Sequence, residues 1–241
     1  MRYGKYVLPS EALYCPICGH AIRNRKVDEQ VASNLLAIIL GLQQYKIKER
    51  YASVRIGKYQ FVDMGLTHKW STCNLGACSF SGIDQGLYYA WGEIEPKSEY
   101  SRDNHKYIKK KRLFLADIYV NIGNCISGTR YDPVSEFFSN PKIHLPTMSD
   151  WLELIEECRW INCLGNYYKV VGPNGNHIIL PYHAGICANE LSHGIISCDY
   201  LSGNAPYENC VRVLHLSDTE YRLSDKGGRY LGRMVRPVCD M

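Results

Sequence analysis

Between residue 58 and the end of the chain, short β-branched and aromatic segments are interrupted every few residues by Gly, Asn or Pro. This punctuation limits strands to a few residues and disfavours long helices. Residues 167–171 and 177–180 are the clearest strands, because the connection between them contains Asn174 and Gly175, a dipeptide typical of hairpin turns. Residues 210–216 and 230–235 have the same character. The sequence therefore predicts an α+β domain of small antiparallel sheets.

One helix is indicated after Pro146. Thr147 can act as its N-cap, and Asp150, three positions later, can complete a capping box. Apolar side chains then recur at spacings of three and four and are expected to line the buried face of the helix: Trp151, Leu154, Ile155 and Cys158.

Residues 1–57 have a different sequence pattern from the rest of the chain and are interpreted as a short appendage to a domain of residues 58–241. They contain a Cys-x-x-Cys motif, then a stretch at 31–42 whose apolar residues recur at helical spacing, then a charged connector at 46–50. The apolar stripe of such a helix has to pack on the main domain or on a partner.

The motif Cys15-Pro-Ile-Cys18 has the form of half a zinc knuckle. A structural zinc ion needs four ligands, and the chain has no second Cys-x-x-Cys, so His20, a distant cysteine or a second subunit would have to complete the site. A free thiol pair is one alternative. A redox pair is another, although the strand before and helix directly after that such a motif needs are not evident. Cys15 and Cys18 are thus the predicted metal ligands, with zinc as the candidate cofactor.

In two other pairs, Cys73 with Cys78 and Cys158 with Cys163, the cysteines are five positions apart in the sequence. Such pairs could form a metal or redox site, but buried, inert thiols are the favoured interpretation, because the second pair lies at the end of the predicted helix with Cys158 on its apolar face. Without an export signal, the eleven cysteines are expected to be reduced.

The composition is that of an ordinary globular protein, with 46% hydrophobic and 22% charged residues. Nineteen Tyr against five Phe suit half-buried strands, and a binding surface is the alternative interpretation. The net charge of +4 is too small to indicate a nucleic-acid or membrane partner. A basic cluster between His105 and Arg112 could attract phosphates, but it is interpreted as a solvated loop.

The first ten residues lack the apolar core of a secretory signal. The longest apolar stretch, residues 35–42, is far shorter than the ~18 residues that cross a bilayer. We therefore expect a cytoplasmic protein without a membrane span. The sequence does not fix its oligomeric state.

No catalytic constellation is evident in the chain. It has eight His and many Ser, but it lacks the Gly-x-Ser-x-Gly and His-Glu-x-x-His motifs and a phosphate-binding Gly-rich loop. Its carboxylates are expected to be solvated charges on helix faces and loops. The chain is therefore predicted not to be an enzyme.

Several short sequence segments, taken together, indicate a protein family more specifically than any single motif. In order, they include Phe61-Val-Asp-Met-Gly-Leu66, Lys69-Trp-Ser-Thr-Cys-Asn74, Tyr89-Ala-Trp-Gly-Glu93, Leu145-Pro-Thr147, Gly172-Pro-Asn-Gly-Asn176 and Val235-Arg-Pro-Val238. In this order they resemble the Fibrobacter succinogenes major paralogous domain family, which is abundant in gut Bacteroidales. That family is similar in fold to formylglycine-generating enzymes and to the variable proteins of diversity-generating retroelements. The resemblance covers roughly residues 58–238.

The resemblance implies a C-type-lectin-like fold, in which two short helices lie around small, twisted antiparallel sheets. It also implies ligand binding rather than catalysis, because in the retroelement relatives the C-terminal strands and loops carry the ligand-binding surface. On this basis residues 199–230 are expected to bind a protein or glycan. The candidate ligand-binding residues are Asp199, Tyr200, Asn204, Tyr207, Asn209, His215, Tyr221 and Arg222.

Other functions and another location stay open. Many family members are exported, so a surface or secreted location is the alternative to the cytoplasm. An oxidase like the formylglycine-generating enzymes would need a copper-binding pair of cysteines, for which Cys198 and Cys210 are available but not closely spaced. A nucleic-acid or assembly role would rest on the motif at Cys15 and Cys18 and on the basic cluster, and would show binding that falls steeply with salt.

Overall fold

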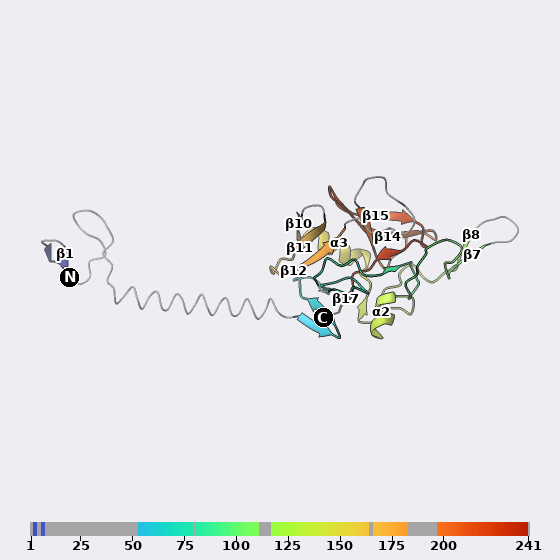
Figure 1. Ribbon diagram of the computed structural model, residues 1–241, viewed down its shortest axis with the longest axis horizontal. Coiled ribbons are helices and arrows are strands. Elements are labelled where there is room, and N and C mark those ends of the chain that lie inside the picture. The colour runs from blue at the N-terminus through green and yellow to red at the C-terminus, as the bar shows by residue number, and fades with distance from the viewer. Residues whose placement is uncertain are drawn as a thin grey trace. The chain divides into compact units, whose positions relative to one another are not determined.

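The computed structural model describes residues 2–3, 6–7, 53–79, 81–110, 117–163, 166–182 and 197–240 (Figure 1). The chain divides into two units, Met1–Glu49 and Arg50–Met241. In the first unit the described residues form two short antiparallel strands, β1 (Arg2–Tyr3) and β2 (Tyr6–Val7). The helix predicted at 31–42 and the predicted zinc ligands Cys15 and Cys18 lie outside the described residues.

The second unit is built from small sheets, as predicted. One five-stranded sheet has the order β3-β4-β5-β17-β9, formed by Ser53–Ile56, Tyr59–Val62, Lys69–Ser71, Val238–Cys239 and Ile143–His144. A second has the order β15-β14-β13-β16-β6, formed by Tyr221–Gly227, Cys210–Ser217, Ser197–Leu201, Arg233–Met234 and Tyr88–Tyr89. Among the described strands, all pairs are antiparallel except β13 with β16.

Two smaller sheets lie at opposite sides of the second unit (Figure 1). The three-stranded sheet consists of β10 (Arg159–Cys163), β11 (Tyr167–Val171) and β12 (His177–Pro181), in that order. The other is a hairpin of β7 (Ile108–Lys110) and β8 (Asp117–Tyr119). The hairpin predicted around Asn174 and Gly175 is confirmed, because β11 and β12 pair directly and Gly175 has the positive φ of 84° that this turn requires.

Two helices occur in the described part of the chain. The predicted helix is confirmed as α3 (Met148–Glu157), with Thr147 and Asp150 forming the reciprocal bonds of a capping box. The other, α2 (Pro133–Phe138), was not predicted from the residue pattern, although the family resemblance implies a second short helix. Asp132 caps α2 by accepting hydrogen bonds from the backbone N–H groups of Val134 and Ser135.

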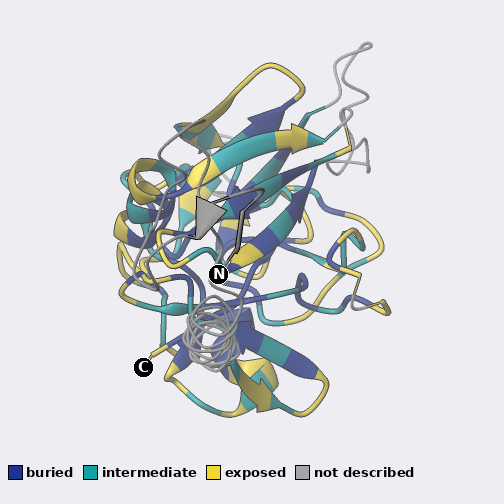
Figure 2. Cartoon of the chain, turned by 90° about the vertical axis from the view of Figure 1, so that its left-hand side faces the viewer, coloured by how far each residue is buried: buried dark blue, intermediate teal, exposed yellow. Residues whose placement is uncertain are grey.

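The buried side chains form two main clusters, and buried positions concentrate on the strands (Figure 2). Phe61 and Trp91 belong to the first cluster. The second is centred on Trp70, Trp151 and Tyr200, whose rings meet with centroids 4.8 Å apart for the two Trp and 5.8 Å apart for Trp151 and Tyr200. Burying each such side chain is worth about 1.5–3 kcal/mol, so these contacts hold α3 and both large sheets together.

The described residues thus form an α+β fold of small antiparallel sheets with two short helices. None of the described helices has the length and apolar character needed to cross a membrane.

Candidate ligand-binding surface

The sheet of β13, β14 and β15 aligns three of the predicted ligand-binding residues. Asp199 on β13 pairs directly with His215 on β14, and His215 pairs directly with Arg222 on β15. Directly opposed residues in neighbouring strands point to the same face of a sheet. The three side chains therefore form a row across the strands, here called the polar row.

The inner end of the polar row is a fixed charge. Asp199 Oδ1 lies 2.8 Å from His215 Nδ1, and Asp199 Oδ2 lies 3.7 Å from Nε of the buried Arg233. Burial alone would raise the pKa of Asp199, but the hydrogen bond from His215 and the charge of Arg233 outweigh it and hold the pKa below its usual value. Because an ionised carboxylate only accepts hydrogen bonds, the proton between the two residues is on His215 Nδ1.

The outer end of the polar row is accessible. Arg222 is 49% exposed, and its Nε lies 3.0 Å from Oε1 of Glu220, which is 48% exposed. The second ring nitrogen of His215 points the same way, with Nε2 4.0 Å from Glu220 Oε1. Asp199 fixes the His215 ring, and the surface offers its imidazole nitrogen beside the paired guanidinium of Arg222 and carboxylate of Glu220. Such an arrangement presents hydrogen-bond donors and an acceptor to a polar ligand, with the imidazole already ordered.

Tyr221 lies on the other face of the same sheet, because it neighbours Arg222 along β15. Its ring stacks on Trp160 at 4.4 Å with an interplanar angle of 8°, and the Tyr221 side chain stays 37% exposed. This aromatic pair is separate from the polar row.

The other predicted residues do not join the polar row. Tyr200 is fully buried and donates its hydroxyl hydrogen to the carbonyl oxygen of Pro181, so it belongs to the core. Asn204 caps α3 by accepting a hydrogen bond from the Met148 backbone N–H at 2.7 Å. Tyr207, 67% exposed, and the exposed Asn209 precede β14. Within β14, Cys210 and His215 are about 17 Å apart at ~3.3 Å per residue, so Tyr207 and Asn209 adjoin the end of the strand that is far from the polar row.

The cysteines named in the oxidase hypothesis lie far apart. Cys198 is paired with Leu216, six positions beyond Cys210 on β14, which separates the two thiols by about 20 Å. This register does not favour a shared copper site.

Of the pairs expected to be buried, Cys73 and Cys158 are buried as predicted. Burial raises the pKa of Cys158 to about 11, which suits an inert thiol. The prediction is wrong for their companions, since Cys78 is exposed and Cys163 is half-buried. Cys78 follows the core residue Ala77 at the point where the chain leaves the core for an exposed loop, which is why its thiol is not enclosed.

The basic cluster is less uniform than its sequence indicates. His105 is buried, and burial lowers the pKa of its ring, whose Nε2 lies 3.2 Å from the carbonyl oxygen of Trp91. The backbone N–H of Lys106 donates to the buried Glu93 carboxylate, which also pairs with Lys97 at 2.6 Å. A cavity of about 230 Å³ adjoins these groups, and the charges of Glu93 and Lys97 in its lining pair with each other. Residues 111–116, which include the end of the predicted basic cluster, lie outside the residues that the structure describes.

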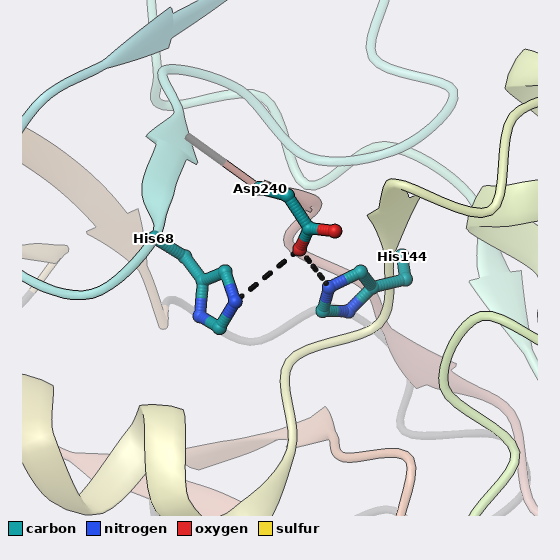
Figure 3. A group of neighbouring side chains, drawn as sticks. All are labelled: His68, His144 and Asp240. Atoms are coloured by element: carbon teal, nitrogen blue, oxygen red, sulfur yellow. Dashed lines mark hydrogen bonds and ion pairs between the residues drawn. The ribbon is translucent and has the colours of Figure 1, made fainter.

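A second polar cluster was not predicted from the sequence. His68, His144 and Asp240 meet on the other five-stranded sheet, and Figure 3 shows both imidazole rings turned toward the carboxylate. No local signal could reveal it, because each residue stands alone in the sequence and 96 positions separate His144 from Asp240. Only the strand order of the sheet brings them together.

The comparisons with known proteins add no relative: the chain matches no family model, and no curated protein or solved structure is significantly similar to it.

Proposed function

We propose that residues 58–241 form a C-type-lectin-like domain of the Fibrobacter succinogenes major paralogous domain family, and that this domain binds a protein or glycan ligand without catalysing a reaction. The fold assignment is supported by the two short helices and the small antiparallel sheets, and by the sequence segments that resemble the family in the same order. The observation that carries the function is the polar row of Asp199, His215 and Arg222.

Binding fits the polar row because its parts divide between fixed and accessible groups. Asp199 is 16% exposed and is held by His215 and Arg233, whereas Arg222 is half exposed. Side chains mounted on paired strands vary little in position, so they can discriminate between ligands by hydrogen-bond geometry. In this proposal Arg222, Glu220 and His215 Nε2 contact the ligand and Asp199 positions the imidazole.

The test compares variants on the two faces of one sheet. Arg222→Gln and His215→Gln remove groups of the polar row, whereas Arg212→Gln removes a partly exposed guanidinium from the opposite face of β14. The three proteins and the parent are applied to a glycan array and to bead-coupled capture from cell-envelope extracts. The proposal expects one ligand to be captured by the parent and by Arg212→Gln, and to be lost or strongly reduced with the two polar-row variants. Equal capture by all four proteins would contradict it.

A further inference from the structure

The cluster of His68, His144 and Asp240 is built where three paired strands, β5, β17 and β9, lie side by side. Asp240 directly follows β17, which lies between β5 and β9. His68 directly precedes β5, and the pairing of Cys239 with Lys69 places Asp240 opposite His68. His144 belongs to β9 and pairs with Val238, two residues from Asp240, so its side chain is on the same face. The backbone N–H of Asp240 donates to the carbonyl oxygen of Lys142 at 2.9 Å and extends the pairing.

The three side chains meet at one carboxylate oxygen. Asp240 Oδ1 lies 3.0 Å from His144 Nε2 and 3.3 Å from His68 Nε2 (Figure 3). The two rings stand nearly perpendicular, at 85°, with centroids 5.3 Å apart. The His144 side chain is 11% exposed and that of His68 is 21% exposed, whereas Asp240 is 42% exposed. The cluster is thus enclosed on the histidine side and open on the aspartate side.

The opposite nitrogens of both rings are also held by oxygen atoms. His68 Nδ1 lies 2.9 Å from Oδ1 of the buried Asp150, whose other oxygen accepts the capping bonds of Thr147. His144 Nδ1 lies 2.8 Å from the carbonyl oxygen of Leu145. Both of these oxygens only accept hydrogen bonds, so each Nδ1 carries a proton and each Nε2 of a neutral ring presents a lone pair.

Four ring nitrogens face oxygen acceptors, whereas two neutral imidazoles have only two N–H groups. The Asp240 carboxylate is therefore satisfied either by extra protons on the Nε2 atoms or by a cation bound between the three side chains. With both protons on Nδ1, the two Nε2 lone pairs and the Asp240 carboxylate all point at one another. A cation placed among them turns three repelling acceptors into three ligands, and a divalent ion also balances the charges of Asp150 and Asp240.

We propose that His68, His144 and Asp240 bind a divalent transition-metal ion, with zinc as the ion that fits best. Imidazole and carboxylate donors with an open position are typical of zinc sites that keep a water or exchangeable ligand. Two imidazoles among three donors disfavour calcium and magnesium, which take oxygen ligands. The contacts of Asp150 and Leu145 to the far ring nitrogens are the outer hydrogen bonds that fix metal-binding histidines.

The distances agree with this ion. Ligand atoms bound tetrahedrally at roughly 2.0–2.1 Å from zinc stand about 3.3 Å apart, close to the 3.0 and 3.3 Å that separate Asp240 Oδ1 from the two Nε2 atoms. All three atoms lie within 4.8 Å of one another, so a small rotation of the rings brings the two Nε2 atoms to a similar separation. The exposed side of Asp240 leaves the fourth position to solvent or to a group from a partner.

The experiment has to separate this site from Cys15 and Cys18. The full chain carrying Cys15→Ser and Cys18→Ser is therefore the starting protein, and Asp240→Asn and His68→Gln are introduced into it one at a time. Asp225→Asn, which removes an exposed carboxylate paired with Arg212 on another sheet, is the matched control. Zinc affinity is measured by competition with a chromophoric chelator, and Tm is measured with zinc and with EDTA.

The proposal expects the starting protein and the Asp225→Asn control to bind one equivalent of zinc and to gain Tm from it. Asp240→Asn and His68→Gln should each bind zinc roughly tenfold more weakly or worse and lose the gain in Tm. Cobalt in the starting protein should give tetrahedral visible bands without a thiolate charge-transfer band. A Tm that zinc does not raise in the starting protein, or equal zinc affinity in the Asp240→Asn variant, would overturn the proposal and leave the cluster as hydrogen bonds that join the strands.

Discussion

Replacing Asp199 by Asn tests whether the polar row rests on a fixed charge. The substitution keeps the shape of the side chain and the acceptor for His215 Nδ1, but it removes the negative charge beside His215 and Arg233. A hydrogen bond to a charged group contributes about 1.5–3 kcal/mol and a neutral one about 0.5–1.5 kcal/mol. Adding the lost attraction to the buried Arg233, we expect the free energy of unfolding to fall by about 2 kcal/mol.

The assay is urea unfolding followed by Trp fluorescence. All four Trp lie between residues 70 and 160, so the signal reports the second unit alone. Asp225→Asn is the control, because its ion pair with Arg212 is well exposed on both sides and is worth at most about 1 kcal/mol. If Asp199→Asn cost no more than Asp225→Asn, the account of a fixed inner charge would be refuted.

The pH dependence gives a second check. The pKa of Asp199 is lower in the folded protein than its ordinary value of about 4, so its stabilisation is complete above that value and is lost as the pH falls through the folded pKa. The difference between the parent and Asp199→Asn should therefore shrink as the pH is lowered from about 5 to below about 4. A difference that grows over this range would contradict the direction of this shift.

Three further substitutions or treatments have expected outcomes. The buried Asp132 carboxylate accepts hydrogen bonds from four backbone N–H groups and one hydroxyl, and Asp132→Asn puts an amide NH₂ in place of one of its oxygens. The free energy of unfolding in urea should fall by about 3 kcal/mol or more, and a fall of less than about 1 kcal/mol would contradict this. Gly172→Ala places a Cβ against the carbonyl oxygen of Met64 and should lower the unfolding free energy by about 1–3 kcal/mol, whereas an unchanged midpoint would show that the close approach is absent. In native protein iodoacetamide should label the exposed Cys78 and spare Cys158, as read by peptide mass spectrometry; early labelling of Cys158 would contradict its burial and raised pKa.

The elements with strong local signals were predictable from the sequence. The capping box of Thr147 and Asp150 fixes where α3 begins, and the Asn174-Gly175 turn fixes the β11–β12 register, because in both cases neighbouring residues satisfy each other's hydrogen bonds. Helix α2 has six residues, too few for apolar periodicity, and β15 is a polar edge strand that is defined by pairing with β14. Neither element shows a periodic apolar pattern of its own, although Asp132 followed by Pro133 is a local start signal for α2 that was missed in the sequence.

The candidate surface was predictable only in part. The resemblance directed attention to residues 199–230, and three of the eight candidates form the polar row. Strand alternation explains part of the remainder, since Asp199 and Tyr200 are neighbours on β13 and must point to opposite faces. The cluster of His68, His144 and Asp240 depends on the order of three strands from distant parts of the chain, which no local pattern encodes.

The most direct test of the central claim is the affinity of the captured ligand for Arg222→Gln compared with Arg212→Gln. Both substitutions remove one partly exposed guanidinium from the same sheet, but from opposite faces. We predict that the dissociation constant rises about tenfold or more for Arg222→Gln, the loss of a charged hydrogen bond, and stays within about twofold of the parent for Arg212→Gln. Equal affinities for the two variants, or a larger loss with Arg212→Gln, would contradict the assignment of the binding surface to the polar row.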